Sequence, residues 1–134
     1  MTNTQIRAPL EAVMPFFITG SLEAAIEFYV KRLGFIKEVA IPEPAPFFAI
    51  VQRDRVGIML KEVGAETLPQ PNHTRHGWAR WDAYIYSPDP DALFEEFSGR
   101  QVKFHQPIAD TNDGLRAFEV MDHDGYVLCF GRLK

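Results

Sequence analysis

The stretch SLEAAIEFYVKRLGF, residues 21–35, contains the start, the apolar face and the end of a short helix. Ser21 suits the N-cap, because its hydroxyl can accept a hydrogen bond from the free backbone amides of the first turn. Apolar residues then recur at steps of three and four, which is typical of a helix that buries one face. Gly34 predicts the helix end, since glycine adopts the left-handed conformation easily. The predicted apolar face consists of Leu22, Ala25, Ile26, Tyr29 and Leu33.

Strand-like segments surround this helix. Residues 13–19 form an apolar, aromatic-rich run that predicts a buried strand before the helix. Residues 35–41, 47–52 and 56–61 predict three short strands after it. Residues 53–55 predict a tight turn between the last two of these strands.

The second half of the chain repeats this order. Residues 78–86 predict a strand, and Asp89 and Pro90 suit the cap and the first position of a second helix. Three further strands are expected at 102–108, 115–121 and 126–131. The repeat is one of pattern, because sequence identity between the halves is slight.

The predicted fold is therefore α+β, with two βαβββ modules in a single domain, residues 1–134. The modules are expected at 12–61 and 78–132, with a polar linker at 62–77. Each sheet would cover its helix with one face and leave the other face free. Two curved sheets facing each other would enclose a cleft.

Composition excludes several classes of function. The chain has 134 residues, a formal charge of −4 and no apolar run near the roughly 18–20 residues of a membrane span. That charge argues against nucleic acid and anionic membranes as partners. The single cysteine excludes an internal disulfide and a cysteine-rich zinc site. These features predict a cytoplasmic protein.

Two motifs resemble a known family. The helix of residues 21–35 resembles the "FY…LGF" helix of the vicinal oxygen chelate superfamily. Residues 118–126, FEVMDHDGY, resemble its "F-x-V-x-D-P-D-G-N" turn, with departures at His123 and Tyr126. This superfamily contains glyoxalase I, extradiol dioxygenases, fosfomycin resistance enzymes and bleomycin resistance proteins, and the sequence looks most similar to the last group. The resemblance implies the paired-module fold and, because chains of this length commonly pair in the family, a homodimer.

The resemblance also implies where a metal would bind. Metal enzymes of the superfamily place His, Glu or Gln ligands on strand positions that face the cleft. These positions correspond here to Met14, Met59, Asp82 and Cys129. Only Asp82 is a plausible ligand for Fe, Mn, Ni or Zn, and one carboxylate does not hold a divalent ion against water. We therefore expect no metal and no other cofactor.

Strand alternation predicts which side chains line the cleft. The residues that share a face with the four metal positions are aromatic or apolar, whereas Trp81, Ala83 and Ile85 are expected to point toward the core. Arg116 stands where similar sequences often carry an arginine, so it is a candidate contact for an anionic group. The predicted ligand-binding residues are Met14, Phe16, Met59, Trp78, Asp82, Tyr84, Arg116 and Cys129.

This lining predicts a metal-free protein that sequesters a planar hydrophobic or aromatic molecule, such as an antibiotic. Aromatic faces stack on planar rings, and methionine adapts to irregular ligands. No catalytic residue is predicted. Two alternatives stay open: a metal-dependent lyase, isomerase or dioxygenase of the same superfamily, and a structural or regulatory dimer whose aromatic residues only bury an interface.

Overall fold

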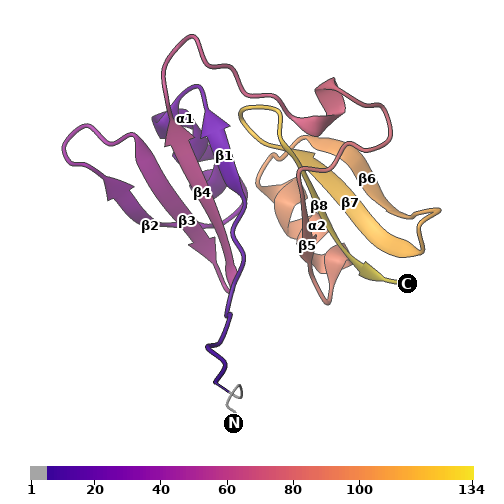
Figure 1. The fold of residues 1–134 in the computed structure, drawn as a ribbon. Coiled ribbons are helices and arrows are strands. Elements are labelled where there is room, and N and C mark those ends of the chain that lie inside the picture. Colours follow the sequence, from indigo (N-terminus) through magenta and orange to yellow (C-terminus); the bar gives the residue numbers. More distant parts are fainter. Residues whose placement is uncertain (1–5) are drawn as a thin grey trace.

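The computed structural model describes residues 6–134 and consists of two four-stranded mixed sheets, each with its own helix (Figure 1). The strand orders, β1-β4-β3-β2 and β5-β8-β7-β6, are equivalent. In both sheets the first strand is parallel to its neighbour and the other pairs are antiparallel. The predicted α+β fold of two βαβββ modules is confirmed. The first module contains β1 (Phe16–Thr19), α1 (Leu22–Glu27), the π-helical turn η1 (Phe28–Arg32), β2 (Ile36–Ile41), β3 (Phe48–Arg53) and β4 (Val56–Glu62). The rest of the chain contains the 3₁₀ turn η2 (Asn72–Thr74), β5 (Ala83–Tyr86), α2 (Pro90–Gly99), β6 (Phe104–Asp110), β7 (Leu115–Met121) and β8 (Val127–Leu133).

Both helices begin at the predicted caps. The Ser21 hydroxyl accepts a hydrogen bond from the Ala24 amide, and Asp89 does the same for Ala92 in α2. Gly34 has a φ of +74°, the left-handed conformation expected after the first helix. The expectation of one continuous α-helix up to that glycine is wrong in one respect, because α1 ends at Glu27 and the chain continues as η1.

The strand predicted at 78–86 is much shorter than expected, because β5 begins only at Ala83. Contacts with the linker explain the difference. The Asn72 side-chain amide donates to the Trp81 carbonyl at 2.7 Å, which occupies a carbonyl that a sheet ladder would use. The Asp82 carboxylate in turn accepts from the Asn72 backbone amide at 2.9 Å. These bonds hold the segment before β5 in an irregular conformation.

One hydrophobic core lies on the helix side of both sheets and joins the two modules. Alternate side chains of β4, Ile58 and Leu60, point into this core, whereas β8 is buried on both faces from Val127 to Gly131. Within the described residues, no helix is long and apolar enough to cross a membrane. The largest fully buried core side chains include Tyr29, Leu33, Ile58 and Leu60 from the first module and Phe97, Phe118 and Leu128 from the second.

A buried polar contact ties the modules together. The Tyr29 hydroxyl donates to Asp122 Oδ2 at 2.6 Å, and Asp122 Oδ1 accepts from the backbone amides of Asp124 and Tyr126. Tyr126 stacks on Phe17 of β1 with ring centroids 4.2 Å apart. Its hydroxyl donates to a carbonyl of β1 at 2.7 Å. The turn between β7 and β8 is therefore fixed against the first module.

Asp122 gives this junction a predicted pH dependence. Burial raises the pKa of its carboxyl group from 3.8 to about 6, against the opposing effect of the hydrogen bond from Tyr29. The folded state then binds the proton more tightly than the unfolded state, so stability is highest below pH 4 and falls as the pH rises to about 6. Asp122→Asn mimics the neutral carboxyl group and removes this titration. Between pH 4 and 6.5, the free energy of unfolding of the wild type should fall by about 1–3 kcal/mol relative to the Asp122→Asn variant.

Urea unfolding at several pH values measures this difference. Asp113→Asn, in the exposed turn between β6 and β7, is the matched control and should follow the wild-type profile. Parallel pH profiles for the wild type and Asp122→Asn would contradict the prediction.

Candidate ligand-binding site

The face of the first sheet that lies opposite its helix is apolar and partly open. Phe16, Met59 and Ile50 lie side by side across β1, β4 and β3. Phe16 is about half exposed, and its ring stacks on Phe48 with centroids 6.5 Å apart. The Met14 thioether extends over Gly57, where even a single added methyl group would clash with it. Met14, Phe16 and Met59 therefore share one surface, as alternation predicted.

The open face of the second sheet carries a hollow of about 520 Å³. Its aromatic wall consists of Trp81 and Tyr84, whose rings stack with centroids 5.8 Å apart, and the exposed Tyr86. Cys129 lies directly beside Tyr84 in the sheet and is completely buried. The full lining is Trp81, Tyr84, Tyr86, Leu115, Arg132 and Leu133.

A buried carboxylate lies under this surface. Glu119, on β7, is only 4 % exposed. It accepts two hydrogen bonds from Arg80, at 3.0 and 2.7 Å, and one from the indole nitrogen of Trp81 at 2.8 Å. His105 Nδ1 lies 2.9 Å from Oε1 of Glu119. Glu119 therefore fixes the indole ring that forms the wall of the hollow.

The electrostatics of this cluster keep Glu119 ionised. Desolvation opposes the charge, but hydrogen bonds from Arg80, His105 and Trp81 outweigh it and lower the pKa of Glu119 below its usual value.

The neighbouring thiol of Cys129 stays protonated. Burial raises the pKa of Cys129 to about 12, with a further contribution from Glu119. A neutral, buried thiol is a poor nucleophile.

The sequence suggested two sheets that face each other across a cleft. In the structure, the two open faces do not face each other. The sheets lie side by side, with both helices behind them in the view of Figure 1. A groove of about 530 Å³ runs between the sheet edges, between the β1–β4 side and β5. The predicted inward positions on β4 and β8, Ile58, Leu60, Leu128 and Phe130, are confirmed as core.

Three of the predicted ligand-binding residues lie elsewhere. Trp78 is 85 % exposed and precedes β5, so it shares no sheet face with Tyr84. Asp82 lines the groove between the sheets, but its two oxygens accept hydrogen bonds from the backbone amides of Asn72 and Val127. Arg116 lies on the helix side of β7, paired with Asp91 of α2 at 2.6 Å.

The alternation argument also misplaced Trp81. It was expected in the core with Ala83 and Ile85, but it lies on the open face against Leu115, Ala117 and Cys129. Alternation holds only inside a regular strand, and Trp81 precedes β5.

The sequence reasoning missed Glu119 and its partners Arg80 and His105. A local signal existed, because Glu119 is the only charged residue in the otherwise apolar strand segment AFEVM, residues 117–121. A charged side chain enclosed by such neighbours needs partners if it is buried. The identity of those partners depends on strand pairing and could not be read from β7 alone.

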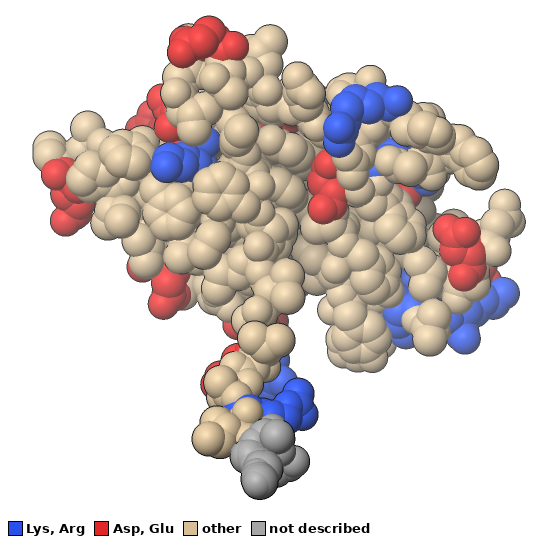
Figure 2. All heavy atoms as spheres, in the orientation of Figure 1, with Lys and Arg blue, Asp and Glu red and all other residues tan. Residues whose placement is uncertain are grey.

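The residues at the superfamily's metal positions do not fit a metal ion. Met14, Met59 and Cys129 offer thioethers and a protonated thiol, and the oxygens of Asp82 already bind backbone amides. Across residues 6–134, no group of three or more His, Cys, Asp or Glu side chains is arranged to hold a metal. Figure 2 shows that the middle of the open side is largely uncharged, with most charged residues around its margin.

Comparison with known proteins agrees with this fold. The model of the Glyoxalase/Bleomycin resistance protein/Dioxygenase superfamily matches residues 11–130. No curated protein shows significant similarity to the sequence.

Solved structures of similar fold include binding proteins and an enzyme. The bleomycin-binding protein from bleomycin-producing Streptomyces verticillus, complexed with copper(II)-bleomycin, is 23 % identical with a TM-score of 0.69, over 96 % of this chain and 100 % of that one. TnmS3, an antibiotic binding protein from Streptomyces sp. CB03234, is 18 % identical with a TM-score of 0.60, over 92 % and 97 %. Lactoylglutathione lyase from Agrobacterium tumefaciens is 18 % identical with a TM-score of 0.64, over 92 % and 95 %. At these identities the structures establish the fold alone, and the family match over most of the chain establishes that this protein belongs to the glyoxalase/bleomycin resistance/dioxygenase superfamily.

Proposed function

We propose that this protein binds a planar hydrophobic or aromatic small molecule, such as an antibiotic, on the open face of its second sheet and sequesters it without a chemical step. The observation that carries this proposal is the hollow lined by Trp81, Tyr84 and Tyr86, with the indole fixed from below by Glu119. Its volume lies in the range of small-molecule sites. Two similar folds are described as binding bleomycin or an antibiotic, which supports the same class of ligand.

The arrangement favours a flat ligand. Aromatic rings gain most when a planar partner stacks on them, and a ring that is already held in place loses little conformational freedom on binding. Glu119 holds Trp81 through a charged hydrogen bond, so the wall is formed before the ligand arrives. Arg132, at the rim, offers a cation to an acidic or carbonyl group of the ligand.

We also propose that the protein is a homodimer. Ile6, Leu10 and Val13 are each more than nine-tenths exposed, on an arm that extends away from the body in Figure 1. Phe16 and Leu133 on the open faces are exposed as well. Apolar exposure on this scale is typical of a surface that a partner covers. A second copy that covers the open faces would also deepen the hollow.

The binding proposal is tested with Trp81 as the only reporter. The chain has two tryptophans, so Trp78→Phe leaves Trp81 as the sole indole and removes no residue of the hollow. In this background, titration with bleomycin and with doxorubicin should give a saturable change of fluorescence for at least one of them. Tyr84→Ala should then weaken binding about tenfold, because one stacking partner is lost.

Phe47→Ala, an exposed aromatic residue before β3, serves as the control and should bind normally. The absence of a saturable signal with both compounds would count against the proposal. Turnover of methylglyoxal and glutathione that is lost on addition of a chelator would favour the metal-dependent alternative instead.

A separate prediction concerns the contribution of Glu119 to stability. Glu119→Gln leaves three donor groups around a neutral amide, so the free energy of unfolding should fall by about 1–3 kcal/mol at pH 7. Because the pKa of Glu119 is lowered in the folded state, the deficit should diminish as the pH falls through that pKa. Emission from Trp81 should also shift, since its hydrogen-bond acceptor changes. Glu95→Gln, on the exposed side of α2, is the matched control, and equal stability of the two variants would refute the assigned role.

The dimer prediction is tested by light scattering at micromolar concentration. The expected mass is twice the 15.3 kDa of the chain. The double change Leu10→Asp and Val13→Asp should give a folded monomer, because it places negative charges on the arm that the second copy would cover. Leu68→Asp, at an exposed leucine of the linker, should leave the mass unchanged. A monomeric wild type would contradict the prediction.

A further inference from the structure

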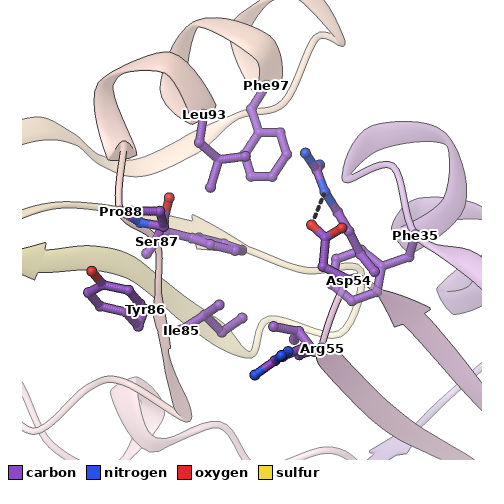
Figure 3. Close-up of a pocket in the computed structure, with 12 residues that line it drawn as sticks. Phe35, Asp54, Arg55, Ile85, Tyr86, Ser87, Pro88, Leu93 and Phe97 are labelled. Atoms are coloured by element: carbon purple, nitrogen blue, oxygen red, sulfur yellow. Dashed lines mark ion pairs between the residues drawn. The ribbon is translucent and has the colours of Figure 1, made fainter.

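A third cavity lies at the junction of the two modules, next to the groove between the sheet edges. It has a volume of about 350 Å³ and lies between the β3–β4 turn of the first module and the segment from β5 into α2 of the second. In Figure 3, Leu93 and Phe97 extend from α2 over one side, and Ile85 and Arg55 lie on the opposite side. Tyr86 also lines the hollow on the second sheet, and Arg55, Val56, Ile85 and Tyr86 also line the groove between the sheet edges.

The walls are apolar and come from both modules. Phe35 and Val56 belong to the first module, whereas Ile85, Leu93, Phe97 and Phe130 belong to the second. Phe35, Phe97 and Phe130 are almost completely buried, so the cavity opens directly from the core. Three aromatic walls suit a small ring or a short apolar chain.

The two arginines of the β3–β4 turn differ in their pairing. Arg53 donates to both oxygens of Glu96, at 2.9 and 2.8 Å, and to the Leu33 carbonyl at 2.7 Å. Asp54 also lies 3.9 Å from Arg53. Glu96 is therefore fully engaged by Arg53, whereas Asp54 is exposed and itself lines the cavity.

Arg55, an exposed residue, lines the same cavity, and its side chain makes no ion pair or hydrogen bond with the rest of the described chain. Ser87 lies beside Pro88, across the cavity from Arg55 in Figure 3. A guanidinium without a carboxylate partner beside an apolar chamber is a group that would recognise a carboxylate attached to an apolar body.

We propose that this junction cavity is a binding site for a small apolar monocarboxylate, with its hydrophobic part among Leu93, Phe97 and Phe130 and its carboxylate on Arg55. Such a ligand would contact both modules at once. Because it would bind the folded chain and not the unfolded chain, it would raise the melting temperature.

The test uses 4-phenylbutyrate as the probe and 4-phenylbutanol as its uncharged match. NMR of methyl groups reports the place of binding, because Leu93 lines the junction cavity alone, Val56 and Ile85 line both this cavity and the groove between the sheet edges, and Leu115 and Leu133 line the hollow on the second sheet. Shifts at Val56 and Ile85 without Leu93 would therefore place the compound in the groove and overturn the proposal. We expect saturable shifts at Val56, Ile85 and Leu93, with a dissociation constant of about 0.1–1 mM. The alcohol should bind about tenfold more weakly, since it lacks the charge that pairs with Arg55.

Arg55→Gln should weaken binding of 4-phenylbutyrate about tenfold and leave binding of the alcohol unchanged. Arg75→Gln, at an exposed arginine of the linker, is the matched control and should not change either affinity. Leu93→Trp, which fills the chamber, should abolish binding of both compounds. Shifts at Leu115 and Leu133 alone, equal affinity for acid and alcohol, or no effect of Arg55→Gln would each overturn the proposal. None of these outcomes depends on the planar ligand of the second sheet, so the two proposals fail separately.

Discussion

The hydrogen bond between Tyr29 and Asp122 is the contact on which the relation of the two modules depends. It joins the helical segment of the first module to the β7–β8 turn of the second, at a position closed to water. The same turn is held by the stacking of Tyr126 on Phe17 and by the hydroxyl of Tyr126 on a β1 carbonyl. Because an unpaired buried polar group is strongly destabilising, the tyrosine and the aspartate constrain each other. The orientation of the two sheets, and therefore the direction of both open faces, follows from this junction.

That orientation determines which surfaces of the sheets stay uncovered. With the helices on the same side, the core closes behind the sheets, and two apolar faces remain uncovered on the other side. The second face has a rigid aromatic wall, whereas the first carries flexible methionines over Phe16 and Phe48. Rigid aromatic residues give affinity for one shape, and methionines adapt to several. If a second copy brings the first face of one chain over the second face of the other, each bound ligand would lie between a rigid and an adaptable surface.

The fold was accessible from sequence because its signals are local. Ser21 and Asp89 cap helices through amides three residues away, and Gly34 ends a helix through its own backbone conformation. The candidate site depends on contacts between distant segments. The linker residue Asn72 binds the Trp81 carbonyl, and this bond ends the alternation from which the facing of Trp78, Trp81 and Asp82 was inferred. Arg116 was placed by resemblance, and only the packing of α2 on β7 shows that it serves Asp91.

The hydrogen bonds of Asp82 remove its carboxylate from metal coordination. A carboxylate ligand must offer a free lone pair toward the metal, and both oxygens of Asp82 are used to hold the linker and the start of β8 in place. Glu119, the other carboxylate near the hollow, is similarly committed to Arg80, Trp81 and His105. A metal could recruit either carboxylate only by breaking these charge-assisted hydrogen bonds. The same hydrogen bonds that hold the Trp81 indole in place therefore also withhold Glu119 from coordination.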